Sequence, residues 1–411
     1  MLFKSIILNT SIMSDLKKAD KKSYRFRLIK TGIFLSGLSV FAQLYLFQPL
    51  LPLVSEYFNT GAGNSSLLVS SSTIGMATGL FFFAFKADAY SRKKLMVFSL
   101  ISSALLTFIS TWIPNLEVLI GIGFLKGFLV SGVSAVALAY LTEEVEISSV
   151  TLAISMYLSG NTIGGMSGRI STTILAGEYG WKIAVMIIGS VSLILGLTFW
   201  KIFPGSRFFH PQRTDYSLKI KQMRKFLSDP FLLSLFCIAA LIMGTFVSIY
   251  NYLSFRLEAP PFSLSHYFIA LIFLMYIFGV FGTMLTSYLS KYYEKRNILK
   301  YFIVIMFASL FLFYSQNIFL LIFGLALFTL SFFSAHTMAS QMVAIRAKYG
   351  KSSATSIYWL FYYFGSSILG SGTGYLLHVT SWNIFISSLA SILFIAFLLA
   401  GKFLIISKKT S

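Results

Sequence analysis

Two basic side chains, Lys126 and Arg169, lie inside long apolar runs of the chain, and His336 lies inside another, in the sequence SAHTM. A cation in an apolar layer needs an anion, a carbonyl group or access to the surface, because its hydration is lost there. Lys126 and Arg169 are therefore candidates for binding an anionic ligand. The alternative for Arg169 is that it binds helix carbonyls or reaches the surface. His336 could exchange protons near neutral pH, or it could only pack between helices.

The acidic residues offer these cations no partner at the same depth. The chain has 13 Asp and Glu residues, and each lies in a polar join or at the end of an apolar run. A buried carboxyl group is a common proton carrier in membrane proteins, because loss of hydration raises its pKa toward neutrality. Without one, a proton carrier in this chain would have to be His336, Lys126, or Glu143 and Glu144 at the mouth of a run.

Patterns typical of catalysis or metal binding are missing from the sequence. The four histidines are far apart, at positions 210, 266, 336 and 378, and Cys237 is the only cysteine. The sequence contains no phosphate-binding GxxxxGK[ST] loop and no pair of carboxylates inside an apolar run. We therefore expect no enzymatic activity, no cofactor and no metal site.

The composition is typical of a protein that crosses a membrane many times. Of the 411 residues, 56% are hydrophobic and only 11% are charged, and the mean hydropathy is +0.79. A soluble protein has about a quarter of its residues charged. The net charge of +20 would suggest a nucleic-acid ligand in a soluble protein. Here the cations form short clusters between apolar runs, so we expect the lipid bilayer as a partner and no nucleic acid.

Twelve apolar runs are long enough to span a membrane. A helix needs about 20 apolar residues to cross a hydrocarbon layer of roughly 30 Å. The runs that meet this length are 31–53, 65–85, 95–113, 117–140, 149–175, 182–203, 230–252, 266–289, 298–315, 318–341, 354–377 and 383–405. We therefore predict an all-α membrane protein with 12 transmembrane helices.

The distribution of Lys and Arg orients these helices, because cytoplasmic loops retain more basic residues than external loops. If both termini are in the cytoplasm, all but four of the 33 Lys and Arg residues lie on the inner side of the membrane. The exceptions are Lys182 and Arg256 in outer loops, and Lys126 and Arg169 in the membrane. We therefore expect both termini to be cytoplasmic.

The second half of the chain repeats features of the first. The glycines within 160–168, in the fifth span, are echoed about 205 residues later by FGSSILGSGTG (364–374) in the eleventh. The basic turn DAYSRKK (88–94) after the second span is matched by SKYYEKR (290–296) after the eighth. Two six-helix halves with pseudo-two-fold symmetry would produce this pattern. The predicted segments are a cytoplasmic tail at 1–30, an N-terminal half at 31–204, a cytoplasmic connector at 205–229, a C-terminal half at 230–405 and a tail at 406–411.

The turn after the second span carries a charged motif formed by Ala84, Asp88, Ser91, Arg92 and Lys93. This motif resembles Gly-x-x-x-Asp-x-x-Gly-Arg-Arg/Lys of the major facilitator superfamily, with Ala84 and Ser91 in place of the two glycines. The resemblance implies the twelve-helix fold of that superfamily. It also implies that the motif fastens the two halves together on the cytoplasmic side.

In that superfamily the motif's arginine faces carboxylates below the fourth span, and its aspartate faces a helix N-terminus. Glu143 and Glu144 follow the fourth span here, in a segment without cations. We therefore expect Asp88, Arg92 and Lys93 to form a cytoplasmic gate with Glu143 and Glu144. The alternative is a basic membrane anchor beside an acidic surface loop.

Four further stretches are similar to one bacterial subgroup of that superfamily, the YnfM-type or arabinose-efflux-like inner-membrane permeases. They are LYLFQPLLP (44–52), YLSGNTIGGMSGR (157–169), SFFSAHTMAS (331–340) and YYFGSS (362–367). The resemblance implies a monomeric secondary transporter of the bacterial inner membrane that alternates between inward-open and outward-open states. We expect it to export a small organic solute in exchange for protons. The alternative is uptake or uniport of an anionic or sugar-like metabolite.

Polar side chains inside the spans are the candidate solute-binding residues. In the fourth span, where the superfamily often has an arginine, this chain has Gly123, and Lys126 follows about one turn later on the same face. The full set of candidates is Tyr45, Gln48, Lys126, Asn161, Arg169, Asn251, Tyr252, His336, Tyr362 and Tyr363.

The fifth span contains SGNTIGGMSGRI (159–170), which is rich in glycine. On a helix with about 100° per residue, its glycines form a stripe with Arg169 at the edge. Small residues let another helix backbone approach closely. We therefore expect a helix-packing hinge that slides at the interface between the halves. The hinge residues are Gly160, Gly164, Gly165 and Gly168.

Overall fold

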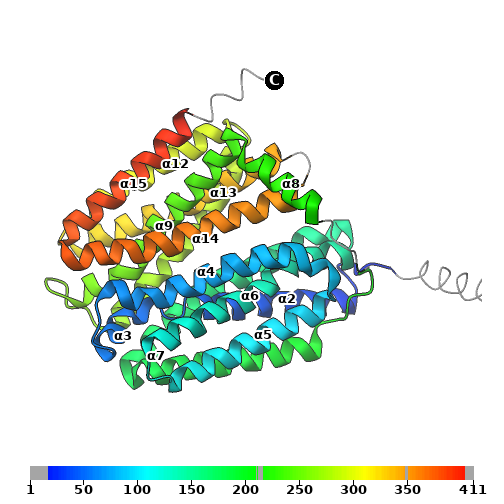
Figure 1. Cartoon of the computed structure of the whole chain (residues 1–411), viewed down its shortest axis with the longest axis horizontal. Helices are drawn as coiled ribbons and strands as arrows, with labels where there is room; N and C mark the ends of the chain where they lie inside the picture. The colour runs from blue at the N-terminus through cyan, green and yellow to red at the C-terminus, as the bar shows by residue number, and fades with distance from the viewer. Residues whose placement is uncertain (1–16, 210, 212–215, 348–349, 403–411) are drawn as a thin grey trace, which may run out of the picture.

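The computed structural model describes residues 17–209, 211, 216–347 and 350–402, and these residues are almost entirely helical. Within these ranges the only β structure is an isolated bridge between Ala19 and Val145. The helices form two bundles that lie side by side, one from each half of the chain (Figure 1). The connector helix α8 (Tyr216–Leu227) lies at one end of the second bundle.

The N-terminal bundle contains the helices that carry the predicted spans one to six. They are α2 (Tyr24–Leu44), the short helices η1 (Gln48–Leu50) and α3 (Leu51–Tyr57), α4 (Ala62–Lys86), α5 (Arg92–Ile109), α6 (Leu116–Glu144) and α7 (Ile147–Ile202). Glu143 and Glu144 form the last turn of α6 and not a loop after it.

The C-terminal bundle carries spans seven to twelve. Its helices are α9 (Pro230–Glu258), α10 (His266–Ile272), α11 (Tyr276–Leu289), α12 (Lys295–Leu310), α13 (Ile318–Arg346), α14 (Lys351–Val379) and α15 (Trp382–Lys402). Several begin with a side-chain cap, which satisfies backbone N–H groups that have no partner in the first turn. Asp229, for example, accepts hydrogen bonds from the backbone N–H groups of Phe231 and Leu232.

The number of spans agrees with the prediction. In the described part of the chain, ten helical segments are long and apolar enough to cross a membrane. The 56-residue α7 contains two predicted spans, which are separated by a bend at Gly180. The backbone φ angle there is 80°, a value that glycine adopts more readily than other residues. α14 is not among the ten, but its 29 residues extend over about 44 Å at 1.5 Å per residue, which is enough to span the bilayer. Together they make twelve.

The first span begins earlier than predicted. The Ser23 side chain accepts a hydrogen bond from the Phe26 backbone N–H at 3.1 Å and caps the helix that starts at Tyr24. This start lies within the segment 1–30 that we expected to be a tail. The charged residues before the apolar run are therefore partly helical.

The first span is also interrupted. α2 ends at Leu44, and a turn at 45–47 leads into the short helices η1 and α3. Pro49 and Pro52 follow the turn. Proline lacks a backbone N–H and clashes with the preceding helical turn, so it ends a regular helix. The side chains near this break therefore point in other directions than they would on a continuous helix.

The two bundles repeat one close helix contact, as the sequence repeat predicts. In the first bundle a Cβ added to Gly164 of α7 would lie 2.2 Å from the backbone oxygen of Leu38 in α2. In the second, a Cβ added to Gly365 of α14 would lie 2.0 Å from the backbone oxygen of Ala240 in α9. Both contacts require glycine, because a side chain would occupy the same space as the neighbouring backbone.

A row of hydroxyl groups joins the bundles along α4 and α14. Ser66 donates a hydrogen bond to Ser371 at 3.1 Å, and Ser371 donates to Ser70 at 2.6 Å. Further along, the hydroxyl groups of Thr73 and Ser367 are 2.8 Å apart. We call these five residues the hydroxyl ladder. It holds the halves together with short, reversible hydrogen bonds, without a covalent or ionic link.

The halves contact each other at the end of the molecule opposite the connector. The connector end carries α8 and the turn at 87–91, and the far end carries the turn around Gly180. At the far end, Tyr267 of α10 donates a hydrogen bond to Glu178 of α7. Next to it, a Cβ added to Gly177 would lie 2.9 Å from the Cβ of His266. The halves are therefore in contact at the far end.

Candidate functional site

Arg169 lies at the centre of a polar cluster in which both halves take part. Its Nε donates a hydrogen bond to Gln48 Oε1 at 2.7 Å, and its Nη1 donates to the Gly165 backbone oxygen at 2.5 Å. The Gln48 amide in turn donates to Asn251 Oδ1 at 2.8 Å. Arg169, Gln48 and Asn251 are all buried. Three residues predicted from the sequence are thus brought together: Gln48 from η1, Arg169 from α7 and Asn251 from α9.

Two tyrosine rings cover the guanidinium group of Arg169. Its Cζ lies 4.5 Å from the ring centre of Tyr45 and 4.6 Å from that of Tyr276. A ring face stabilises a cation through its quadrupole, most strongly where water is excluded. Tyr45 was predicted from the sequence, whereas Tyr276 was missed, since nothing in the sequence separates it from the other tyrosines. We call Tyr45, Gln48, Arg169, Asn251 and Tyr276 the central cluster.

The central cluster contains a positive charge without a negative partner. In the described part of the chain, the groups that contact Arg169 are an amide oxygen, a backbone oxygen and two rings, and none of them is charged. The break in the first span produces this arrangement, because it places Tyr45 and Gln48 on the irregular segment beside Arg169. The charge is therefore solvated by dipoles and ring faces alone.

Lys126 lies elsewhere in the N-terminal half. It is 2% exposed, and its Nζ lies 5.2 Å from the ring centre of Phe47, which precedes Gln48. Among the described residues, no hydrogen-bond acceptor or carboxylate contacts this ammonium group. Its helix packs closely on α4, since a Cβ added to Gly127 would lie 1.9 Å from the Ser72 backbone oxygen. Lys126 is therefore a second buried cation, separated from Arg169 by the broken segment.

Of the remaining candidates, His336, Tyr362 and Tyr363 lie in the C-terminal half. His336 Nδ1 is 2.8 Å from the Tyr358 hydroxyl, and its ring centre is 4.8 Å from that of Tyr362. The ring of Trp359 contacts the two tyrosines that follow it, with ring centres 5.1 Å from that of Tyr362 and 5.9 Å from that of Tyr363. His336 is thus part of an aromatic cluster, and its hydrogen bond and ring contacts among the described residues do not include Arg169.

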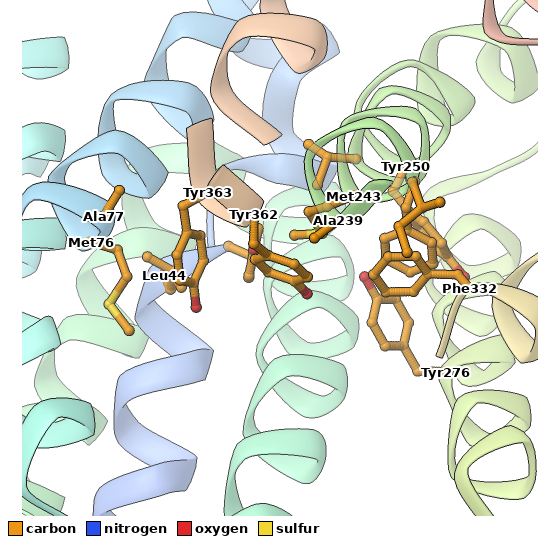
Figure 2. Packing of buried hydrophobic residues seen from close by; sticks show 14 of the residues in the cluster. Leu44, Met76, Ala77, Ala239, Met243, Tyr250, Tyr276, Phe332, Tyr362 and Tyr363 are labelled. Atoms are coloured by element: carbon orange, nitrogen blue, oxygen red, sulfur yellow. The ribbon is translucent and has the colours of Figure 1, made fainter. Parts of the chain in front are cut away.

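A series of aromatic contacts connects His336 with the central cluster. The His336 ring lies 6.0 Å from that of Phe332, which lies 3.9 Å from that of Phe246, measured between ring centres. From Phe246 the path continues to Tyr250 at 4.8 Å, and from Tyr250 to Tyr276 at 4.9 Å. Figure 2 shows Tyr362 and Tyr363 between side chains of α2 and α4 on one side and of α9 and α13 on the other. The C-terminal half thus supplies an aromatic wall to the region where the halves meet.

Asn161 and Tyr252 have packing roles in this structure. The Asn161 side-chain oxygen lies close to α2, since a Cβ added to Gly37 would be 2.4 Å from it. The Tyr252 hydroxyl donates a hydrogen bond to the Gly370 backbone oxygen at 2.5 Å, and the Asn251 amide donates to the same oxygen at 3.4 Å. Tyr252 and Asn251 therefore bind the same backbone oxygen of α14.

The glycine stripe of the fifth span lies inside one half. A Cβ added to Gly160, Gly164 or Gly168 would meet the backbone of α2 at 2.3, 2.2 or 2.7 Å. α2 belongs to the same bundle as α7, so these glycines do not form the sliding surface between the halves that we expected. Gly165 faces Arg169, since its Cβ would lie 3.2 Å from Nη1. The stripe lets α7 approach α2 closely enough for Arg169 to reach Gln48.

Three charged residues of the predicted gate, Arg92, Glu143 and Glu144, have partners within the N-terminal half and its connector. Arg92 Nη2 lies 2.8 Å from Glu143 Oε1, and both residues belong to that half. Glu144 is fully buried and lies 2.5 Å from Arg25 Nη2. It also accepts hydrogen bonds from the backbone N–H groups of Arg207 and Phe208 in the connector. The side chain of Asp88 lies outside the described residues, and the Lys93 side chain has no hydrogen-bond or ion-pair partner among them.

The sequence matches a described protein family over most of its length. Residues 33–370 match the model of the Major Facilitator Superfamily. An uncharacterized transporter of Buchnera aphidicola subsp. Schizaphis graminum is 38% identical over 98% of this chain and 97% of its own. The inner membrane transport protein YnfM of Escherichia coli K12 is 35% identical over 92% of this chain and 91% of its own.

Solved structures with little sequence identity have the same fold. A bacterial homolog of the human lysosomal transporter Spinster, in an inward-facing and unoccupied conformation, superposes with a TM-score of 0.72. It is 14% identical, and the match covers 94% of this chain and 96% of that one. A D-xylose-proton symporter, also 14% identical, gives a TM-score of 0.70 over 92% of this chain and 98% of that one.

Proposed function

Because the chain belongs to the major facilitator superfamily and is thus a multi-pass membrane transporter of a small solute, we propose that this solute is an organic anion. The chain carries it across the bacterial cytoplasmic membrane by alternating access between two six-helix halves. The connector end faces the cytoplasm, in keeping with its many basic residues. The protein acts as a monomer and uses no cofactor.

The observation that carries this proposal is the uncompensated charge of Arg169. It lies where both halves meet, and its partners among the described residues are neutral. Guanidinium groups bind carboxylates with two parallel hydrogen bonds, which gives both affinity and orientation. A carboxylate that displaces Gln48 would replace a neutral acceptor with a charged one. Its binding energy would then be available to rearrange the contacts between the halves.

The aromatic wall supports an organic rather than an inorganic anion. Tyr45 and Tyr276 flank the guanidinium group, and Phe246, Tyr250 and Phe332 continue the wall within the C-terminal half. Apolar and aromatic surfaces with a few polar groups are typical of sites for small organic ligands. The carboxylate of the solute binds Arg169, and its carbon skeleton packs on the rings.

Export in exchange for protons is the proposed direction, with His336 or Lys126 as the proton carrier. His336 has an imidazole nitrogen 2.8 Å from the Tyr358 hydroxyl, a contact through which a proton can pass. The second candidate is uptake or uniport of an anionic metabolite. The two buried cations, Lys126 and Arg169, favour it, because they suit an anion without any need for a proton carrier.

A panel of ligands tests the proposed solute class. The thermal unfolding of the purified protein is measured with benzoate, succinate and lactate, and with the neutral sugars arabinose and xylose. We expect at least one carboxylate to raise the midpoint of unfolding and the sugars to leave it unchanged. Stabilisation by a sugar, with no effect from any carboxylate, would contradict the proposal.

The same carboxylate, radiolabelled, then tests the direction in proteoliposomes. We expect saturable exchange across the vesicle membrane and faster export when the opposite side is made acidic. A flux that responds to no imposed pH gradient of either sign would rule out proton coupling and leave uniport.

A further inference from the structure

A pocket of about 890 Å³ lies at the connector end of the C-terminal half, apart from the central cluster. It is bounded by the connector helix α8, the N-terminal ends of α9 and α12, and the C-terminal end of α13. Its walls carry three basic side chains, Lys225, Lys295 and Arg346, and one acid, Asp229. Figure 1 shows α8 beside this end of the bundle.

The charge of the pocket is only partly compensated. Arg346 Nε is 3.0 Å from Asp229 Oδ2, while the other carboxylate oxygen of Asp229 caps α9. The ring of Phe231 also supports Arg346, 5.4 Å from Cζ. Among the described residues, neither Lys225 nor Lys295 has an ion-pair or hydrogen-bond partner. Two cations in the pocket therefore have no counter-charge within the part of the chain that the structure describes.

Most of the remaining pocket wall is apolar and partly uncovered, beside the polar side chains of Gln222 and Ser228. Phe226, Phe231 and Met342 line it, and Ile345 is 62% exposed at the end of α13. On the adjoining helix α8, Leu218 and Leu227 are also exposed. An apolar surface next to basic groups at the end of membrane-spanning helices lies where the headgroup and acyl regions of a bilayer meet.

We propose that this pocket binds an anionic phospholipid, such as phosphatidylglycerol. The phosphate contacts Lys225 and Lys295, and the outer Nη groups of Arg346 extend the basic surface beside them. The acyl chains cover Ile345 and the neighbouring apolar side chains. Basic pockets between helices, at the membrane surface, are suited to anionic headgroups through charge and hydrogen bonding. The site is separate from the transported solute and does not depend on its identity.

Bound lipid would also connect α8 with the C-terminal half. Lys225 belongs to α8, and Lys295 belongs to α12, so one phosphate joins the connector to the bundle. The connector is held to the N-terminal half as well, through the contact of Lys219 Nζ with the Ala84 backbone oxygen at 2.5 Å. A lipid in this pocket therefore fixes the position of the segment that links the two halves.

Native mass spectrometry of the full-length protein in detergent tests the proposal, with phosphatidylglycerol and phosphatidylcholine titrated separately. Each basic group near a surface adds about fivefold to the affinity for an anionic lipid, so we expect Lys225→Gln with Lys295→Gln to weaken phosphatidylglycerol binding about 30-fold. The matched control is Lys221→Gln with Lys300→Gln, which removes two charges from the same helices outside the pocket. This control should bind as the wild type does.

Two further variants separate a lost contact from a lost fold. Lys225→Arg with Lys295→Arg keeps the charges and should keep the affinity. Ile345→Glu places a carboxylate on an exposed wall, where folding tolerates it, and should also weaken phosphatidylglycerol binding. Equal affinity of the wild type and the double glutamine variant would overturn the proposal. So would equal binding of phosphatidylcholine, or displacement of the lipid by inorganic phosphate, which would identify a soluble ligand.

Discussion

At the scale of single residues, Arg169 combines two properties that usually exclude each other in a membrane interior. It is buried and stable, because Gln48, the Gly165 backbone oxygen and two tyrosine rings replace its hydration. Its charge nevertheless has no carboxylate partner among the described residues. The carboxylate of the proposed solute would therefore replace neutral contacts of Arg169 with charge-assisted hydrogen bonds.

Replacement of Arg169 by methionine should remove the anion site while keeping a side chain of similar length. Loss of a hydrogen bond to a charged group weakens binding roughly 10- to 150-fold. We therefore expect the stabilising carboxylate of the thermal panel to have no effect on Arg169→Met. Arg169→Lys should bind weakly, because an ammonium group cannot form two parallel bonds or stack between rings.

The matched control is Arg256→Met, which removes a guanidinium group near the far end of α9 that packs against Phe262. It should respond to the carboxylate as the wild type does. An unchanged ligand response in Arg169→Met would exclude Arg169 from the binding site.

Residue types predicted part of this site, and the reason for the rest is geometric. Arg169, Gln48 and Asn251 could be found because charged and amide groups are costly in apolar runs. Tyr276 could not, because one tyrosine among 22 carries no such signal. The hydroxyl ladder had a visible signal in the run Ser70 to Thr73 inside an apolar span, and that signal was missed.

At the scale of the elements, the break in the first span and the glycine stripe of the fifth work together. The break places Tyr45 and Gln48 beside α7, and the stripe lets α7 approach α2. Both features were visible as prolines and glycines in the sequence. Which helix the stripe contacts depends on the tertiary arrangement, so we wrongly expected it at the interface between the halves. Helix positions were predicted well, because the apolar runs are long and their ends are polar.

Replacement of Gly164 by leucine should destabilise the N-terminal half itself. The added Cβ would lie 2.2 Å from the Leu38 backbone oxygen, so α2 would have to move. Overpacking of this kind costs about 1–3 kcal/mol of folding free energy. We expect a lower midpoint of thermal unfolding in detergent, with less protein eluting as a single species.

Gly121→Leu in α6 is the matched control, since no atom lies within 4 Å of the added Cβ. It should unfold at the same temperature as the wild type. A normal midpoint for Gly164→Leu would mean that α2 and α7 are not in close contact in the folded protein.

At the scale of the whole molecule, the described contacts leave the halves joined by weak, separable interactions. The hydroxyl ladder runs between α4 and α14, and the far end is closed by the contact of Tyr267 with Glu178. Two short ion pairs among the described residues, Arg92 with Glu143 and Arg25 with Glu144, lie within the N-terminal half and its terminal segment. These pairs stabilise the N-terminal half internally, and the proposed alternating access requires each half to move as a rigid body.

The central claim, that the halves alternate around the Arg169 cluster, is tested most directly by distances across the far end. Spin labels are attached to Tyr179→Cys and Phe268→Cys, two exposed positions on opposite halves, after the only cysteine is replaced by Cys237→Ser. A control pair, Tyr179→Cys with Trp112→Cys, lies within one half. In proteoliposomes we predict two populations of distances for the first pair and one for the control. A single distance for both pairs, unchanged by the stabilising carboxylate, would contradict alternating access.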